Sequence, residues 1–465
     1  MRRLSRIWRG WVMPSNWQQV TLTELYDVSS GLSKPASEFG SGFPFVGFKD
    51  VFNNYFLPSE LTELVQTSEK EQQKCSVKRG DVFLTRTSET MHELGMSSVA
   101  LMDYPNATFN GFTKRLRPKK DNNLLPEYVG YYLRSQRFRN EMLAFSTMST
   151  RASLNNSMIG QLKISFPGFN TQRAIAHVLK TLDDKIELNR QMNETLEAMA
   201  QALFKSWFVD FDPVIDNALA ASNEIPEPLQ QRAEARKTLG EQRKPLPPEI
   251  QSLFPDRFVF TEEIGWVPET WGTSYLGEKA FSEIIASGVD SFDGTKEYIA
   301  TAEVIDTKVQ STKTKVSYME RPSRANMQPV FGSVWFAKMK DSRKLLVFDD
   351  YSLELDKIIL STGFAGIKTT PVSHDFLWCF IQSKAFDIEK NNLANGAVQI
   401  AINNTSIKKI SYIRPSDKVL AAFSERVKVL FNKKYLNDLA SASLSSIRDG
   451  VLPKLLSGEL RIPDA

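Results

Sequence analysis

The stretch TQRAIAHVLKTLDDKIELNRQMNETLEAMAQALFKSWF, residues 171–208, decides the fold. Its apolar residues recur at steps of three and four, no Pro or Gly interrupts it, and most of its residues favour helix. Thr171 can cap the start, and Pro213 lies just beyond the end. Its 38 residues predict one helix about 57 Å long, at about 1.5 Å per residue.

Two asparagines interrupt the apolar stripe of this helix. Asn189 and Asn193 stand where the stripe should continue, and a polar residue in a helix–helix seam fixes the register of pairing at some loss of stability. We expect the partner helix in the same chain, because residues 418–456 repeat the pattern; Leu436-Asn437 follows Leu188-Asn189 by 248 residues (436 − 188). The predicted seam of this intramolecular coiled coil consists of Leu182, Ile186, Asn189, Leu196, Leu203, Leu430, Asn437, Leu444 and Val451.

The repeat extends well beyond the two helices and is the strongest signal in the sequence. Gly80 and Gly332 each indicate a turn that leads into a buried strand. Each half therefore predicts a strand-rich α/β domain followed by a long helix. The matching segments are Pro14–Trp17 with Pro268–Trp271, Val77–Leu84 with Val330–Phe336, Gly111-Phe112 with Gly363-Phe364, Tyr128–Ser135 with Phe376–Ser383, and Leu154–Ser157 with Ile402–Thr405.

The repeat also sets the expected domain boundaries. The fold class is mixed α/β, with two globular domains separated by two long antiparallel helices and related by a pseudo-twofold axis. The connector is rich in Pro and charge, which predicts a linker with one short helix around Pro228 to Leu239. The expected ranges are an extension at 1–13, a first domain at 14–170, a first spacer helix at 171–209, the connector at 210–264, a second domain at 265–416 and a second spacer helix at 417–461.

Composition and charge limit the classes of protein to which this chain can belong. The 465 residues suffice for two or three domains, and 42% of them are hydrophobic. A net charge of +4 is compatible with nucleic acid but weak as a signal alone. Cys75 and Cys379 form no disulfide or metal pattern, no secretory signal is present, and no apolar run approaches the length of a membrane span. The expected location is a reducing cytoplasm, without membrane contact.

Motifs of known catalytic and cofactor sites are missing from the sequence. It contains neither a GxxxxGK[ST] phosphate loop nor GxGxxG. The carboxylate pairs Asp183-Asp184 and Glu262-Glu263 are typical of solvated faces. No catalytic, cofactor or metal residue is predicted for this chain. The three histidines, which lack Cys, His or acidic neighbours at ligand spacing, are His92, His177 and His374.

Basic residues in polar segments of both halves predict binding instead. Arg86-Thr87-Ser88 and Lys338-Met339-Lys340 follow the Gly-led strand of their own half, so both occupy the same place in their domains. Any one of these residues is more often an ordinary solvated charge, but the repetition favours one DNA-binding surface in each half. The candidates are Lys34, Lys49, Arg86, Thr87, Ser88, Lys114, Arg115, Arg151, Lys313, Lys315, Lys338, Lys340, Arg343 and Lys344.

This layout resembles the specificity subunits of type I restriction–modification systems. The segments LFKSWFVDFDP (residues 203–213) and PKLLSGEL (residues 453–460) are very similar to that family, and the resemblance covers Met13 to about Arg461. It implies that each globular domain reads one half of a split DNA target, while the helices set the spacer. It also implies a non-catalytic subunit of an adenine-N6 methyltransferase and endonuclease complex.

The resemblance further implies two methyltransferase subunits and a translocating restriction subunit as partners, with S-adenosylmethionine bound by the methyltransferase and no cofactor in this chain. The ends of the paired helices are more apolar than a solvated end requires. We expect these residues to contact the methyltransferase subunits: Trp207, Phe208, Phe211, Leu452, Leu455 and Leu456.

Two other classes of function stay open from the residues alone. One is a self-contained methyltransferase or nuclease with its own recognition domains, although no segment is left over for a catalytic domain. The other is a coiled-coil scaffold without DNA specificity. Salt-sensitive DNA binding that becomes sequence-selective with partner subunits separates these alternatives.

The helix pair, read as a ruler, gives a first prediction. Insertion of one helical turn into both long helices adds about 5–6 Å. We expect this change to lengthen the unread spacer of the DNA target by about one to two base pairs, since modules on a duplex follow its helical spacing. Sequencing of methylated sites measures the spacer, and an unchanged spacer would contradict the ruler.

Overall fold

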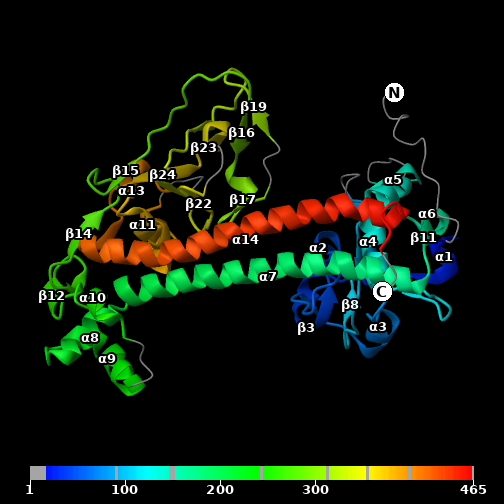
Figure 1. Cartoon of the computed structure of the whole chain (residues 1–465), viewed down its shortest axis with the longest axis horizontal. Helices are drawn as coiled ribbons and strands as arrows, with labels where there is room; N and C mark the ends of the chain where they lie inside the picture. Colours follow the sequence, from blue (N-terminus) through cyan, green and yellow to red (C-terminus); the bar gives the residue numbers. More distant parts are fainter. Residues whose placement is uncertain are drawn as a thin grey trace. The chain divides into compact units, whose positions relative to one another are not determined.

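The computed structural model describes residues 17–88, 93–145, 152–240, 245–310, 314–351, 355–394 and 400–462. The chain forms two compact units, Met1–Asn189 with Leu439–Ala465, and Arg190–Asp438. We call them unit 1 and unit 2. Each contains one mixed α/β domain and parts of two long helices, α7 (Phe169–Phe208) and α14 (Asp417–Ser457) (Figure 1). α7 begins two residues before the predicted start and ends at the predicted residue.

The first domain is built on a four-stranded antiparallel sheet. Its strand order is β2 (Tyr26–Ser30), β9 (Thr113–Pro118), β5 (Val82–Thr85) and β7 (Ser97–Val99). A smaller sheet has the order β4 (Leu64–Val65), β3 (Phe39–Val46) and β8 (Thr108–Phe109), with β3 and β8 parallel. Two-stranded pairs join β1 (Gln18–Thr21) to β11 (Lys163–Phe166) and β6 (Thr87–Ser88) to β10 (Ala152–Ser153). The helices are α1 (Leu22–Leu25), α2 (Phe48–Asn53), α3 (Glu69–Lys74), α4 (Pro126–Arg134), α5 (Gln136–Phe145) and α6 (Asn156–Gln161).

The second domain repeats this topology. Its main sheet has the order β15 (Ser282–Ile284), β24 (Phe364–Thr369), β21 (Ser333–Ala337) and β22 (Leu345–Phe348). A second sheet has the order β19 (Lys315–Val316), β16 (Lys296–Ile299), β23 (Ile358–Ser361) and β20 (Ala325–Met327), with β16 and β23 parallel. Two-stranded pairs join β14 (Gly272–Tyr275) to β25 (Ser411–Arg414) and β17 (Val304–Ile305) to β18 (Lys308–Val309). The helices are α11 (His374–Ile381), α12 (Lys384–Leu393) and α13 (Asn404–Ile407).

Local structure confirms the internal repeat. The Asn155 side chain caps α6 by accepting a hydrogen bond from the Met158 backbone N–H at 2.9 Å, and Asn403 caps α13 in the same way through Ser406 at 2.8 Å. Such caps satisfy N–H groups that have no partner inside the helix. Gly80 and Gly332 both have positive φ, and the strands that follow them, β5 and β21, are fully buried.

One predicted match is displaced by a residue. The register of the main sheets pairs Thr85 with Thr113 in the first domain and Ala337 with Phe364 in the second. Phe364 therefore corresponds to Thr113, and Gly363 corresponds to Phe112. The shared Gly-Phe dipeptide misled the sequence comparison, because insertions in the preceding loops shift the two halves relative to each other.

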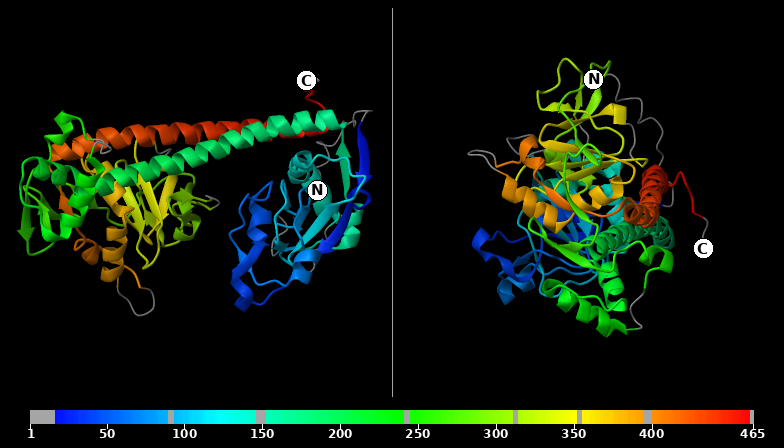
Figure 2. Two further views of the ribbon diagram at one scale, coloured as in Figure 1. Left: turned by 90° about the horizontal axis from the view of Figure 1, so that it is seen from below. Right: turned by 90° about the vertical axis from the view of Figure 1, so that its left-hand side faces the viewer.

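The two long helices pair in antiparallel fashion through polar groups in their seam (Figures 1 and 2). In unit 1, Asn189 Nδ2 donates to Ser441 Oγ at 3.2 Å. In unit 2, Asn437 Nδ2 donates to Asn193 Oδ1 at 2.9 Å. The three asparagines are buried, whereas the predicted apolar seam residues are half-buried, namely Leu182, Ile186, Leu196, Leu203, Leu430, Leu444 and Val451.

The helices also carry ion pairs between them. Arg448 contacts Asp183 at 2.7 Å in unit 1, and Lys434 contacts Glu197 at 3.5 Å in unit 2. The expectation of a solvated carboxylate pair at Asp183-Asp184 is therefore wrong for Asp183, which an arginine on α14 reaches. Among the described residues, no helix is both long enough and apolar enough to cross a membrane.

The connector contains more structure than the single predicted helix. The predicted helix is present as α9 (Glu227–Leu239), but α8 (Asp212–Ala220) and α10 (Pro248–Gln251) accompany it. Pro213 was interpreted as a helix stop, yet it lies in the first turn of α8, where its missing N–H costs no hydrogen bond. The expected boundary at 264/265 falls within a hairpin of β12 (Phe258–Thr261) and β13 (Gly265–Pro268).

Paired charges hold α8 to α9. Arg232 makes a two-point contact with Asp212, with both N–O distances at 2.7 Å, and Arg236 contacts Asp216 at 2.5 Å. The Asp212 and Asp216 carboxylates are buried. Burial alone would raise the pKa of Asp212, but the hydrogen bonds from Arg232 and Ser206 bring it below its usual value. The parts of the connector at 210–240 and 245–264 therefore belong to unit 2.

The six apolar residues expected to contact partner subunits belong to the chain's own cores. None is more than 7% exposed. The premise of the partner-contact prediction is wrong, because the apolar surface at the helix ends is already covered by residues distant in sequence. Trp207, Phe208 and Phe211 pack in the core of unit 2, and Leu452, Leu455 and Leu456 pack in the core of unit 1.

This burial gives a stability prediction. Leu455→Ala should lower the free energy of unfolding by about 2–5 kcal/mol, because it leaves a cavity in the core of unit 1. Leu436 lies on the same helix and is 51% exposed, so Leu436→Ala should change stability by less than about 0.5 kcal/mol. Urea unfolding followed by circular dichroism compares the two variants, and equal effects would contradict the assigned burial.

Candidate nucleic-acid interface

A fully buried strand in each domain is followed directly by a cationic residue. Arg86 follows β5, where its N–H donates to Phe112 O at 2.7 Å and its carbonyl accepts from Leu154 N at 2.8 Å. Lys338 follows β21, where its N–H donates to Gly363 O at 2.9 Å and its carbonyl accepts from Ile402 N at 2.9 Å. The structure therefore confirms that the two cations occupy the same place. We call each of these places a strand-end tip.

The first tip presents a cation beside an aromatic ring. Arg86 is exposed, and the neighbouring Phe112 is 60% exposed. The side chain of Asn110 holds the backbone of Phe112 in place by accepting its N–H at 2.7 Å. Thr87 is half-buried in β6, and Ser88 contributes its backbone to the pairing with β10. A guanidinium and a fixed aromatic ring at one surface suit phosphate contact and base stacking.

The second tip presents different side chains on the same backbone frame. Lys338 is half-buried and burial lowers its pKa, whereas Lys340 is exposed. Two exposed apolar residues lie with them, Met339 and Ile400, and Lys340 N donates to Ile400 O at 2.9 Å. The tip therefore combines a cation with apolar surface but has no aromatic ring.

Arg324 adds a third cation to this tip. Thr362 N donates to Arg324 O at 2.8 Å, and a Cβ at Gly363 would lie 3.3 Å from the Arg324 guanidinium. The glycine thus leaves room for the side chains of Thr301 and Arg324. Arg324 is exposed.

Lys114 and Arg115 are buried, so the prediction that they belong to a DNA-binding surface is wrong. Lys114 Nζ donates to Ser30 Oγ at 2.8 Å, and burial together with the nearby charge of Arg86 lowers its pKa. Arg115 donates to Ser76 O at 2.6 Å and lies over the Phe109 ring at 5.2 Å. Both residues are on β9. Their side chains point to opposite faces of this strand, but both faces are covered, so neither cation reaches solvent.

Several other candidates use their charge within the chain. Lys34 contacts Glu38 at 2.8 Å and Glu71 at 2.9 Å. Arg343 contacts Asp387 at 3.3 Å, and Lys344 donates to Thr301 O at 2.6 Å. Of the described candidates outside the tips, Lys49, Lys315 and Arg343 are exposed. Arg151 and Lys313 lie outside the described residues.

No alternative chemical site appears in the part of the chain that the structure describes. No group of three or more His, Cys, Asp or Glu residues within it has the geometry to hold a metal ion. Cys75 and Cys379 are buried, and burial raises the pKa of both thiols. His177 is exposed on α7, and His374 is mostly buried with its Nδ1 2.8 Å from Thr369 Oγ1. His92 lies outside the described residues.

Sequence reasoning missed Phe112, Met339 and Ile400 as tip residues. The available signal was the repeat itself, since residues 110–112 correspond to residues 361–363 in the register of the main sheets. That signal predicts that the segments correspond, but it does not predict which side chains are exposed. Phe112 is 60% exposed, whereas Phe364, which also follows a glycine, is fully buried.

Known proteins with similar sequences share one description. Residues 14–198 match the family model for the type I restriction modification DNA specificity domain. The type I restriction enzyme HindI specificity subunit of Haemophilus influenzae is 26% identical over 96% of this chain and 100% of its own. The MjaIX specificity subunit of Methanocaldococcus jannaschii is 24% identical over 97% of this chain and 95% of its own.

A solved structure also matches over most of the chain. It is the S subunit of a type I restriction-modification system from M. genitalium, with 14% sequence identity and a TM-score of 0.48. The match covers 95% of this chain and 96% of the other.

The first tip gives a prediction for Arg86. Arg86→Ala should weaken binding to duplex DNA by about 1–3 kcal/mol and lower the slope of log affinity against log salt by about 1, as expected for loss of one cationic contact. Lys70 on α3 is an exposed cation of the same domain, and Lys70→Ala is the matched control. Anisotropy titrations at several salt concentrations test both variants, and equal losses would remove the tip as a specific contact.

Proposed function

We propose, from the premise that this chain belongs to the specificity subunits of type I restriction–modification systems, that its two domains each read one part of a split DNA sequence. The observation that carries the proposal is the strand-end tip, which recurs in both domains on the same hydrogen-bond pattern. A repeated frame that carries cations in both domains supports two similar binding surfaces on one chain.

The two tips differ in the side chains that they offer, which makes the proposed target asymmetric. The first has Arg86 and Phe112, and the second has Lys338, Lys340 and Arg324 with apolar neighbours. Arginine can form bidentate hydrogen bonds to guanine, whereas lysine is a point charge. Two domains that present different groups should select different bases.

In this proposal the chain supplies recognition and other subunits supply the chemistry. Two methyltransferase subunits bind S-adenosylmethionine and methylate adenine N6, and restriction subunits translocate and cut the DNA. The long helices set the spacer between the two parts of the target. Their pairing through buried asparagine side chains supports this role, because it favours one register of the two helices.

The two alternative functions have less support. A self-contained methyltransferase or nuclease requires a catalytic domain, and the expected domains and connector already account for residues 14–461. A scaffold without DNA specificity does not explain why a cation follows the same strand in both domains. The specificity-subunit function explains both features.

An exchange of one domain tests this function. Replacement of Ile284–Pro415 by the corresponding part of a relative should change only one part of the DNA target, because the other tip stays intact. Sequencing of methylated sites in cells that also carry the methyltransferase subunits reads both parts. Replacement of the first domain is the matched experiment and should change only the other part. Change of both parts by a single exchange would contradict separate reading.

A further inference from the structure

In each domain the strand-end tip continues into a segment that returns to the main sheet. We call this segment the tip loop. In the second domain it spans residues 338–344, between β21 and β22, and in the first domain it spans residues 86–96, between β5 and β7, of which 86–88 and 93–96 are described. The second tip loop carries Lys340 and Arg343 with exposed side chains. The backbone of this loop therefore determines where these cations point.

Helix α12 holds the backbone of the second tip loop. Asn391 Nδ2 donates to Asp341 Oδ1 at 2.9 Å, and Asn391 Oδ1 accepts the Asp341 N–H at 3.0 Å. Lys390 Nζ donates to the carbonyl of Ser342 at 2.7 Å. Asp341 has a φ of 54°, a left-handed conformation that residues other than glycine seldom adopt. The contacts with α12 therefore stabilise a loop conformation that the chain does not favour by itself.

Lys390 is an unusual residue for its position, because it is only 2% exposed. Burial lowers its pKa, and a buried charge is costly unless hydrogen bonds and ion pairs satisfy it. Besides the Ser342 carbonyl, its Nζ has Asp387 at 3.9 Å. On the 248-residue offset Lys390 corresponds to Met142 (390 − 248), which is also buried. An apolar side chain thus suffices to fill the core at this place, and the loop contact explains the lysine.

Unit 1 holds its tip loop from the corresponding helix, α5. Arg139 is buried, and its guanidinium donates to the carbonyl of Leu94. The neighbouring Gly95 lies against Met142, since a Cβ on the glycine would be 2.6 Å from Met142 Cε. In both domains a buried cation on the same helix therefore binds a backbone carbonyl of the tip loop. The contact recurs although the two cations occupy different positions of the repeat, which favours a role in what the loop does.

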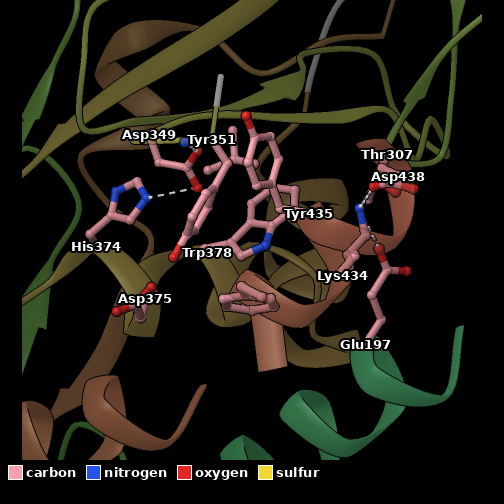
Figure 3. Close-up of a pocket in the computed structure, with 12 residues that line it drawn as sticks. Glu197, Thr307, Asp349, Tyr351, His374, Asp375, Trp378, Lys434, Tyr435 and Asp438 are labelled. Carbon is pink, nitrogen blue, oxygen red and sulfur yellow. Dashed lines mark hydrogen bonds and ion pairs between the residues drawn. The ribbon is translucent and has the colours of Figure 1, made fainter. Parts of the chain in front are cut away.

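The second tip loop is also held through its return strand, β22. Three residues beyond β22, the ring of Tyr351 contacts that of Tyr435 on α14, with centroids 5.1 Å apart (Figure 3). His374 Nε2 on α11 lies 4.0 Å from Asp349 Oδ2, just beyond the same strand. These side chains line a cavity of about 220 Å³ between the second domain and the long helices. The base of the hairpin therefore stays in place when a contact between the loop and α12 is removed.

We propose that Lys390 is a positioning residue for DNA recognition, which holds the tip loop of the second domain in the conformation that discriminates between bases. Arg139 has the same role in the first domain. The proposal rests on the function inferred above, since it requires that the tips read DNA. Base contacts need side chains whose supporting residues are fixed by packing and hydrogen bonds. A loop freed from α12 keeps its cations but not their direction, so it retains phosphate contacts and loses base contacts.

Lys390→Met tests the role of the lysine in the full chain. Methionine fills the same space, as Met142 does in unit 1, but it cannot donate to the Ser342 carbonyl. Preference for the specified bases in the part of the target that the second domain reads should fall at least about 5-fold, while the other part keeps its preference. Lys384→Met removes an exposed lysine from the same helix and is the matched control. Sequencing of methylated sites in cells with the methyltransferase subunits measures both parts, and the domain exchange above assigns each part to its domain.

Two further variants keep the test independent of a loss of folding. Asn391→Ala removes the contact with Asp341 from a partly exposed position, and it should relax the same part of the target as Lys390→Met. Arg139→Met should relax only the other part. Thermal unfolding of each purified variant checks that it is folded. A purely structural role of these residues would lower stability without this division between the two parts.

Binding to a duplex of unrelated sequence separates positioning from simple phosphate contact. For this probe Lys390→Met should bind within about 2-fold of the unaltered chain, because loss of base contacts leaves non-specific binding intact. Unchanged base preference in Lys390→Met and Asn391→Ala, equal relaxation of both parts, or uniformly weaker binding to all duplexes would overturn the positioning role. The lack of any two-part methylated motif with the unaltered chain would instead overturn the proposed function.

Discussion

The antiparallel pairing of α7 with α14 is the constraint on which the rest of the structure depends. A buried amide without a hydrogen bond is costly, so the asparagines in the seam restrict the helices to registers that satisfy them. On the 248-residue offset, Asn189 corresponds to Asn437 and Asn193 to Ser441. The bond from Asn189 to Ser441 and the bond from Asn437 to Asn193 are therefore one contact made once from each helix. Two equivalent contacts, one from each copy of the repeat, thus fix the register of the helix pair.

The same duplication explains how one frame carries two specificities. The hydrogen bonds that hold each strand-end tip involve backbone atoms, so they are retained when the side chains change. Arg86 and Phe112 in one domain are replaced by Lys338 and Gly363 in the other without loss of the frame. Separation of backbone scaffold from exposed side chains allows sequence preference to change while the fold is preserved.

Elements with a local cause could be predicted from the sequence. The C-terminal end of α7 and the glycine turns before β5 and β21 follow from nearby residues. Side-chain exposure could not be predicted, because it depends on distant residues. Arg115 was interpreted as a surface cation, but the carbonyl of Ser76 and the ring of Phe109 enclose it.

The prediction that the apolar helix ends contact partner subunits failed for the same reason, because burial depends on distant residues. Trp207 lies in a T-shaped contact with Phe254, 4.9 Å between centroids, and Phe254 comes from the connector, which the sequence indicated to be a linker. A periodic stripe shows that a helix has an apolar face, but it does not show what covers that face. The corresponding mistake in the connector was to treat Pro213 as a stop, although its place in α8 is one that proline favours.

The most direct test of the central claim is the methylome of cells that carry the methyltransferase subunits, compared with and without this chain. The account predicts that cells with the chain have one methylated motif that cells without it lack. This motif has two unlike specified parts separated by unspecified bases. A methylome that is the same with and without the chain, or a new motif that is continuous and palindromic, would contradict it.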